Sequence, residues 1–224
     1  MKRALFLSIL PILLPGLGLI AQAQVLVNKE PRHHPVFYNG EIRVLNVLIP
    51  PHDTTLYHKH HTPSFFIQLS NTQTGSQLKG QEPSLGNTQS GIIYFENLAY
   101  PNERIHRVWN LDQDTMHVVD VELLKSQYSL DKDPIKEKNL NLAVDTSGIR
   151  AYRLLLNAGE TFHIQAKKRQ VLLISIHSSE IRTNQKGNQP KQVKAGTFFN
   201  LQKTKFFSLT NSGSNPCEFV LLEY

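Results

Sequence analysis

The chain has one cysteine, Cys217, among its 224 residues, so it cannot form an internal disulfide. A chain of this length can rely on a packed hydrophobic core instead, even outside the cell. Cys217 begins the apolar terminal run Cys-Glu-Phe-Val-Leu-Leu. This setting indicates a small buried residue rather than a reactive thiol.

The sequence also lacks the common catalytic signatures. It contains no G-x-S-x-G elbow, no phosphate-binding loop and no H-E-x-x-H helix. No window of 12 or more residues shows the 3.6-residue apolar period of an amphipathic helix. The familiar serine hydrolase, nucleotide-binding and helical zinc protease classes are therefore disfavoured, and a β-rich fold is favoured.

A long apolar run occurs only at the N-terminus. Lys2 and Arg3 precede an almost continuous apolar stretch over residues 5–20, and Ala21-Gln22-Ala23 gives a small-x-small cleavage pattern. These features predict a signal peptide over residues 1–23 that is removed on export to the periplasm or the medium. A retained anchor is the weaker interpretation because the run is short and interrupted by proline, so we expect no stable membrane span after cleavage.

The formal net charge of +6 is unevenly distributed. Residues 24–147 carry 11 basic and 14 acidic side chains, whereas residues 148–224 carry 11 basic and 4 acidic ones. An exported protein rarely meets nucleic acid, so we predict no nucleic-acid partner. The basic half could face an anionic ligand, an anionic envelope component or the acidic half of a second copy, or be simply a solvated surface.

Short strand-like segments fill the rest of the chain. They are rich in Val, Ile, Leu, Phe and Tyr, and turn residues separate them. This spacing predicts an all-β protein built as an antiparallel barrel or sandwich. The clearest segments are Ile42–Ile49, Phe65–Leu69, Gly91–Phe95, His117–Leu124, Ala151–Leu156, Val171–Ile176 and Phe219–Leu222.

A weak internal repeat predicts two such units. At an offset of 107 residues Ile42-Arg43 aligns with Ile149-Arg150 and His52 with Gly159, and at 101 Asn110 aligns with Asn211. We therefore expect one barrel over residues 24–125, a polar linker over 126–146 and a second barrel over 147–224. The polar segment 71–90 is expected to be a loop or hairpin over the barrel mouth, as a plain connection or a lid.

Three histidines carry the chemistry of the first half. His58 and His60 are two residues apart in a strand-like run, so both imidazoles point to the same face. His106 follows on a separate segment and can complete the set from across the barrel. Imidazole nitrogens suit divalent transition metals, so we predict a metal site for Fe, Zn, Mn, Ni or Cu. Chance occurrence of the pair among ten histidines is the competing interpretation.

These residues resemble the two sequence motifs of the cupin superfamily. The first, G-x5-H-x-H-x3-E-x6-G, aligns with His52, His58, His60, Ser64 and Asn71, and the second, P-x-G-x2-H-x3-N, aligns with Pro101, Glu103, His106 and Asn110. The resemblance implies two tandem cupin-type antiparallel β-barrels of the jelly-roll kind, with Pro101 and Asn110 in structural roles. It also suggests a homodimer, since cupin barrels commonly dimerise.

The departures from these motifs affect the expected chemistry. Ser64 stands where the family usually has a carboxylate ligand, which leaves three neutral ligands and a strongly Lewis-acidic ion. Glu103 could substitute for it from the turn, although the family has glycine there. Asn71 replaces a glycine and is expected to tolerate a left-handed backbone.

The second half has lost the motif. Gln165 and Lys167 align with His58 and His60, and Phe207 aligns with His106. We therefore predict a degenerate second barrel with a structural, shielding or dimerising role.

Alternation predicts what surrounds the metal. Ser64, Phe66 and Gln68 share the parity of the two strand histidines and are candidates to line the pocket, whereas Tyr57 and Trp109 are expected to point outward. Gln68 could bond a ligand or satisfy the backbone at the barrel end. The pair His33-His34 precedes the first strand and is expected to be exposed, with packing near the barrel mouth as the alternative.

Two classes of function remain open from the sequence. The first is a metalloenzyme that acts on a small molecule, dioxygenase-like with a redox-active ion or isomerase- or lyase-like with zinc. The second is a non-catalytic module in which the metal captures a small ligand or stabilises the barrel. Fold alone does not separate them, because function depends on the site.

Overall fold

The computed structural model describes residues 24–125, 130, 133–146, 148–166, 169–185, 189–201 and 206–224. The predicted signal peptide 1–23 lies outside the described residues. Within them, no helix is long and apolar enough to span a bilayer.

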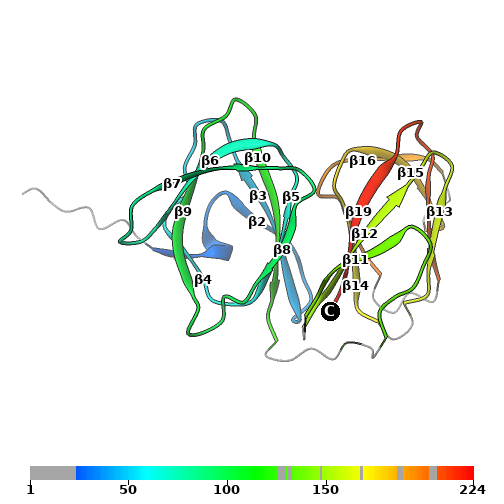
Figure 1. Ribbon diagram of the computed structural model, residues 1–224, viewed down its shortest axis with the longest axis horizontal. Helices are drawn as coiled ribbons and strands as arrows, with labels where there is room; N and C mark the ends of the chain where they lie inside the picture. The colour runs from blue at the N-terminus through cyan, green and yellow to red at the C-terminus, as the bar shows by residue number, and fades with distance from the viewer. Residues whose placement is uncertain are drawn as a thin grey trace, which may run out of the picture.

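The first half of the chain forms two five-stranded sheets, β1-β4-β9-β6-β7 and β2-β3-β10-β5-β8 (Figure 1). Apart from the parallel β1–β4 pair, the neighbouring strands are antiparallel. The elements are β1 (Val25–Leu26), the 3-10 turn η1 (Val27–Lys29), β2 (His33–Tyr38), β3 (Ile42–Ile49), β4 (His58–His60), β5 (Ser64–Gln68), β6 (Thr72–Leu78), β7 (Ser84–Thr88), β8 (Ile93–Glu96), β9 (Arg104–Asn110) and β10 (Met116–Leu123).

The second half repeats this plan with the sheets β11-β12-β19-β14-β17 and β13-β18-β15-β16. The central strands of the two corresponding five-stranded sheets are β10 and β19. The elements are β11 (Leu140–Asp145), β12 (Arg150–Leu156), β13 (Thr161–Ile164), β14 (Val171–Ser175), β15 (Ser179–Thr183), β16 (Lys191–Val193), β17 (Phe198–Asn200), β18 (Phe207–Asn211) and β19 (Cys217–Glu223).

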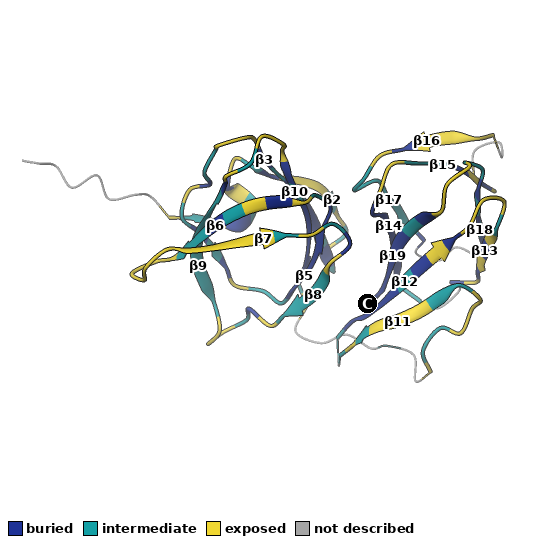
Figure 2. Cartoon of the chain, turned by 45° about the horizontal axis from the view of Figure 1, so that its top comes forward, coloured by how far each residue is buried: buried dark blue, intermediate teal, exposed yellow. Residues whose placement is uncertain are grey.

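The fold-class prediction is confirmed: the protein consists of two tandem antiparallel jelly-roll barrels. Each of the seven strand segments predicted from composition coincides with an observed strand to within one or two residues at most ends. The segment 71–90 forms the β6–β7 hairpin, an exposed edge of its sheet (Figure 2). The predicted linker 126–146 is only partly a connection, because β11 lies within it and pairs with β12.

Three hydrophobic clusters fill the molecule. One lies inside each barrel, and the third lies between them. Alternation produces this arrangement: on β5, Phe66 and Gln68 face the first barrel's interior, whereas Phe65 and Ile67 face the second barrel. Burial of both faces explains why β5 is a nearly continuous apolar run.

Polar contacts also connect the two barrels. Arg153 on β12 donates hydrogen bonds to the carbonyl of Gly91 in the first barrel and to the carboxylate of Glu218 in the second. The side-chain amide of Asn39 donates to the hydroxyl of Tyr224 at 3.3 Å. The barrels therefore form one packed body, side by side in Figure 1.

Equivalent turns in the two halves support the repeat. His52 and Gly159, which the sequence aligns, both have positive φ, at 57° and 78°. Positive φ is uncommon for residues other than glycine, although histidine is among those that adopt it, so the turn occupied by His52 is one that suits glycine. Asn71, which stands in place of the family's glycine, is not among the described residues with positive φ, so its tolerance of a left-handed backbone is not used there.

Cys217 is buried at the start of β19, and burial raises the pKa of its thiol to about 11. At neutral pH the thiol is therefore protonated and poorly nucleophilic. This agrees with a packing role.

Phe65 is fully buried in the hydrophobic cluster between the two barrels, so its truncation should strongly lower the stability of the protein. The Phe65→Ala variant should lose about 3–5 kcal/mol of unfolding free energy, because it leaves a cavity between two sheets. Urea denaturation would measure this. Leu85→Ala is the control, since Leu85 is 76% exposed and its loss should change stability by only about 0.5 kcal/mol. Equal effects of the two substitutions would contradict the described interface.

Candidate metal centre

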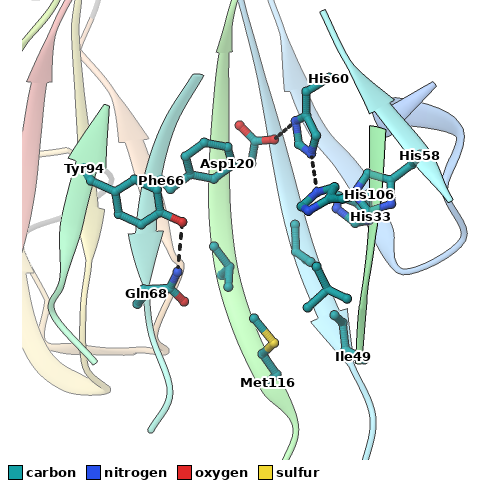
Figure 3. A pocket seen from close by; sticks show the side chains of 13 residues that line it. His33, Ile49, His58, His60, Phe66, Gln68, Tyr94, His106, Met116 and Asp120 are labelled. Carbon is teal, nitrogen blue, oxygen red and sulfur yellow. Dashed lines mark hydrogen bonds and ion pairs between the residues drawn. The ribbon is translucent and has the colours of Figure 1, made fainter. Parts of the chain in front are cut away.

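Four imidazoles converge inside the first barrel (Figure 3). His58 and His60 come from β4, His106 from the adjacent β9 and His33 from the start of β2. The ring centroid of His58 lies 4.6 Å from that of His33, 4.6 Å from that of His106 and 5.1 Å from that of His60. The structure therefore brings together all three histidines proposed from the sequence and adds a fourth.

His58 is held in the orientation of a metal ligand. Its Nδ1 lies 2.9 Å from the carbonyl oxygen of Leu56, to which it donates a hydrogen bond in the matching tautomer. The Nε2 atom is buried and has no hydrogen-bond partner among the described residues. Metal-binding histidines commonly use one nitrogen for such an anchoring bond and offer the other to the ion.

His60 and His106 have the spacing of two ligands on one ion. Their Nε2 atoms lie 3.2 Å apart. Two nitrogens that each bind zinc at about 2.0–2.1 Å in tetrahedral geometry are about 3.3 Å from each other. The donor set thus fits a divalent transition metal.

His33 is the residue that sequence reasoning placed wrongly. It was expected to be exposed, yet it is buried against His58, and its ligand nitrogen groups with those of His58 and His60 within 4.8 Å. His34, its neighbour, is exposed as expected. Alternation could not identify His33, because it lies outside both motifs and reaches the interior only through the turn that starts β2.

A buried carboxyl group stands behind His60. Asp120 on β10 is 1% exposed, and its Oδ2 lies 3.7 Å from Nδ1 of His60. Burial, and then the charge of Glu122, raises the pKa of Asp120 well above its usual value. The Ser64 hydroxyl opposes this rise, although it makes no hydrogen bond of normal geometry to the carboxyl group.

Burial also keeps the imidazoles in the form that binds metals. It lowers the pKa of His58 to about 4, with a further contribution from His33. It lowers the pKa of His106 to about 2, with His58 as the next cause, and holds that of His60 well below its ordinary range. At neutral pH these rings are uncharged, which is the ligand form of histidine.

A cavity of about 80 Å³ adjoins the imidazoles. It is small beside the typical 300–1,000 Å³ of sites for drug-sized ligands. At its far side the amide nitrogen of Gln68 donates to the hydroxyl of Tyr94 at 3.3 Å, and the Gln68 oxygen is buried without a partner among the described residues. The remaining wall is mainly apolar, formed by Val47, Ile49, Phe66, Val108, Met116 and Val118.

The other predicted residues are placed as follows. Phe66 and Gln68 line the cavity, whereas Ser64 is fully buried but does not line it. Glu103 is not part of the site, because it pairs with Lys59 at 3.3 Å on the other face of β4. Pro101 follows a cis peptide bond in the turn before β9.

Asn110 connects the loops at the end of the barrel. Its side-chain nitrogen donates to the carbonyl oxygens of Ile49, Pro50 and Asp114. Asn211 makes the equivalent bonds to Leu156 and Asn215 in the second barrel. This asparagine therefore belongs to the fold and is independent of the histidine cluster.

Tyr57 and Trp109 lie on the outer face of the β4-β9-β6 sheet, as their parity predicts. The Tyr57 hydroxyl donates to the side-chain oxygen of Gln77 at 2.7 Å. The Trp109 ring covers Gly75 so closely that a Cβ there would lie 2.0 Å from it. Neither aromatic residue lines the cavity.

The second barrel serves as an internal comparison for the polar cluster. His58 pairs with His106, which lies four residues before Asn110. Ile164 pairs with Phe207, which lies four residues before Asn211. Strand pairing therefore equates His33, His58, His106 and Asp120 with Leu140, Ile164, Phe207 and Leu221. Ala166, which is buried two residues after Ile164, corresponds to His60 by its position in the sequence. The fold thus forms with apolar residues at all five positions.

The pairing corrects the alignment proposed from the sequence. Gln165 does not occupy the place of His58, because it is exposed and Ile164 is the residue opposite Phe207. Lys167 lies outside the described residues. The sequence offset was wrong by one residue because β4 and β13 begin after loops of different length, and a one-residue slip exchanges the two faces of a strand.

Replacement of the buried carboxyl group of Asp120 should increase the stability of the protein. We expect Asp120→Leu, which introduces the residue of the second barrel, to raise the unfolding free energy of the metal-free protein by about 1–3 kcal/mol, because it removes a buried polar group without good partners. The reverse change Leu221→Asp should destabilise by at least as much. Urea denaturation in the presence of a chelator would measure both. A large loss of stability in Asp120→Leu would contradict this account.

The neutral imidazoles predict acid sensitivity of the metal-free protein. An unfolded histidine binds its proton near pH 6.5, whereas His58 in the folded state does so only near pH 4. Protons therefore favour the unfolded state, and the free energy of unfolding should fall as the pH falls from about 6.5 toward 4. Urea denaturation at several pH values would show the decline. In His106→Phe, which removes one such group, the decline should be smaller, and an unchanged decline would argue against the assignment.

Comparison with solved structures identifies the fold. A cupin 2 conserved barrel domain protein from Leptotrichia buccalis aligns with a TM-score of 0.53 at 9% identity, over 85% of this chain and 86% of that one. The bacterial pirin YhhW from Escherichia coli in complex with nickel(II) aligns with a TM-score of 0.56 at 14% identity, over 87% and 89%. A mutant of the salicylate 1,2-dioxygenase from Pseudoaminobacter salicylatoxidans aligns with a TM-score of 0.54 at 9% identity, over 82% and 71%.

These identities are too low to carry more than the fold. No protein-family model matches the sequence, and no curated protein matches it. The predicted resemblance to cupins is confirmed at the level of architecture. What the site does has to be argued from its own residues.

Proposed function

We propose that this chain, which has the cupin fold in tandem, is an exported metal-binding protein whose metal centre takes a small molecule, as the substrate of a metalloenzyme or as the ligand of a non-catalytic module. Its N-terminal barrel would hold one divalent transition-metal ion on His58, His60 and His106, with His33 alongside. The ligand would enter the adjoining cavity. The second barrel would have a structural role, since apolar residues occupy the equivalent positions.

One observation carries this proposal. Four histidines and an aspartate converge in one barrel, whereas the other barrel of the same chain has apolar residues at the same five places. Buried polar groups destabilise a core unless they are paired. Their concentration at one site is therefore explained by ligand binding better than by folding.

The residues around the histidines suit a small, partly apolar ligand. A bound transition metal would supply Lewis acidity and, if redox-active, the capacity for oxygen chemistry. The mainly apolar wall disfavours water in the site. Gln68, held by Tyr94, has a side-chain oxygen without a partner in the described part of the chain, and this oxygen can accept a hydrogen bond and orient the ligand.

Both classes of function remain candidates, and different observations favour them. The fold is shared with a salicylate 1,2-dioxygenase and with a pirin that binds nickel(II), which makes dioxygenase-like chemistry the first activity to test. Ser64 in place of the family's carboxylate ligand favours a non-catalytic site that captures a ligand, and the small cavity limits a substrate and a captured ligand alike to few atoms. Isomerase- or lyase-like chemistry would apply if the ion is zinc.

The metal content of purified protein tests the proposal directly. Protein prepared without an affinity tag should contain about one transition-metal ion per chain by elemental analysis, and His58→Ala should lose most of it because a first ligand is removed. His163→Ala is the control, since His163 is exposed in the second barrel and its loss should change nothing. A wild-type protein that remains metal-free after incubation with each candidate ion would refute the centre.

Oxygen consumption by the iron-loaded protein then separates enzyme from binding module. Turnover of a small aromatic or enolic compound that disappears in His106→Ala would support the enzyme. Saturable binding of such a compound, with no product for any metal, would support the module.

A further inference from the structure

Glu30 and His33 form a buried pair in a segment that belongs to neither histidine motif. Glu30 follows η1, and His33 begins β2. The Oε2 atom of Glu30 lies 2.8 Å from Nδ1 of His33. With Nδ1 engaged in this way, Nε2 is the atom of His33 that remains for a metal. The ring is tilted by 56° from that of His58, with the two centroids 4.6 Å apart. The pair thus approaches the cluster next to His58.

Glu30 is itself held firmly. Its side chain is fully buried, and Oε2 also accepts a hydrogen bond from the backbone amide of Arg32 at 2.6 Å. The guanidinium of Arg32 also lies 3.7 Å from Oε1 of Glu30. Hydrogen bonds and this ion pair therefore hold the carboxylate in one place beside the cluster.

The same carboxylate also reaches His58. The Oε1 atom of Glu30 accepts a hydrogen bond from the amide of Leu56 at 3.1 Å, and the carbonyl of Leu56 is the anchor for Nδ1 of His58 at 2.9 Å. One carboxylate thereby orients two imidazoles, His33 directly and His58 through a single residue.

The turn itself does not require this arrangement. In the second barrel the amide of Leu140 donates to the carbonyl of Glu137 at 3.3 Å, just as the amide of His33 donates to that of Glu30 at 3.0 Å. Yet Glu137 is exposed, and a leucine stands in place of the histidine. The chain therefore makes the same turn without a buried carboxylate–imidazole pair, and the pair in the first barrel needs another explanation.

We propose that His33 is a fourth histidine ligand of the centre and that Glu30 is the positioning carboxylate behind it; this inference rests on the proposed metal site. Ser64 stands where related motifs carry a carboxylate ligand. In this centre the nearby negative charge would come from Glu30, which lies behind His33 and does not bind the ion itself. A carboxylate that accepts the other N–H of a ligand histidine fixes its tautomer and raises its basicity. It also compensates part of the charge of an ion bound by neutral ligands.

Cobalt(II) titration of the purified protein tests this assignment, with affinity measured by chelator competition and coordination read from the visible absorption of the bound ion. Glu30→Gln should weaken binding about 10–100-fold, which is the usual effect of removing such a partner. His33→Phe, which leaves Glu30 in place, should weaken it at least as much and also change the absorption spectrum, because a ligand is lost.

Two matched controls accompany these variants. His34→Phe alters the exposed neighbour of His33. Asp53→Asn removes a carboxylate outside the segment, which lies 2.8 Å from the guanidinium of Arg32 between Glu30 and His33. Both should keep wild-type affinity and spectrum. Urea denaturation of each metal-free variant detects any effect on folding separately.

The outcomes distinguish failure of this inference from failure of the proposed metal site on which it depends. If Glu30→Gln and His33→Phe unfold more easily but bind cobalt with wild-type affinity and spectrum, Glu30 is only a structural staple and the inference is wrong. If both bind more weakly and His33→Phe changes the spectrum while the controls do not, the inference is supported. If the wild type binds no cobalt, the centre itself is refuted and this inference with it.

Discussion

The structure depends on strands that are buried on both faces. In β5 and β10 of the first barrel, alternate residues face the barrel interior and the second barrel, so one sheet is the wall of a cavity and half of an interface. Phe65 and Val119 pack toward the second barrel, whereas Phe66 and Asp120 face the histidines. A side chain in this wall cannot reach solvent. Unpaired polar groups in the interior are therefore destabilising, and burial lowers the pKa values of the histidines.

The comparison between the two barrels gives this constraint a functional meaning. Both barrels retain the asparagine that connects their loops, Asn110 and Asn211, with nearly the same hydrogen bonds. They differ where side chains meet at the centre, with imidazoles and a carboxyl group in one and apolar side chains in the other. The architecture is thus independent of the chemistry that it surrounds. Likeness of fold to a nickel-bound pirin and a salicylate dioxygenase is informative about shape, and the polar cluster is the observation that suggests a metal.

The polar cluster is assembled in two layers. Imidazoles from β2, β4 and β9 surround one point, and two of the rings are held from behind, His58 by the carbonyl of Leu56 and His33 by Glu30. Asp120 lies near His60, at 3.7 Å, without a hydrogen bond to it among the described residues. The two hydrogen bonds restrict the rings of His58 and His33 to one orientation, which lowers the entropy that binding an ion would cost. On the opposite wall, Gln68 and Tyr94 provide the polar contact for a ligand, and the remaining wall is apolar.

The sequence alone determined the all-β class, the repeat, the main strands and the convergence of His58, His60 and His106, because strand alternation and motif spacing are local properties. It did not reveal His33, whose place depends on how the turn after η1 returns to the barrel. It missed β11 inside a polar segment, and it placed Gln165 opposite Phe207 where the structure has Ile164. These features depend on which strands pair and in which register, and only the tertiary structure decides that, since one residue of slip moves a side chain from the core to the solvent.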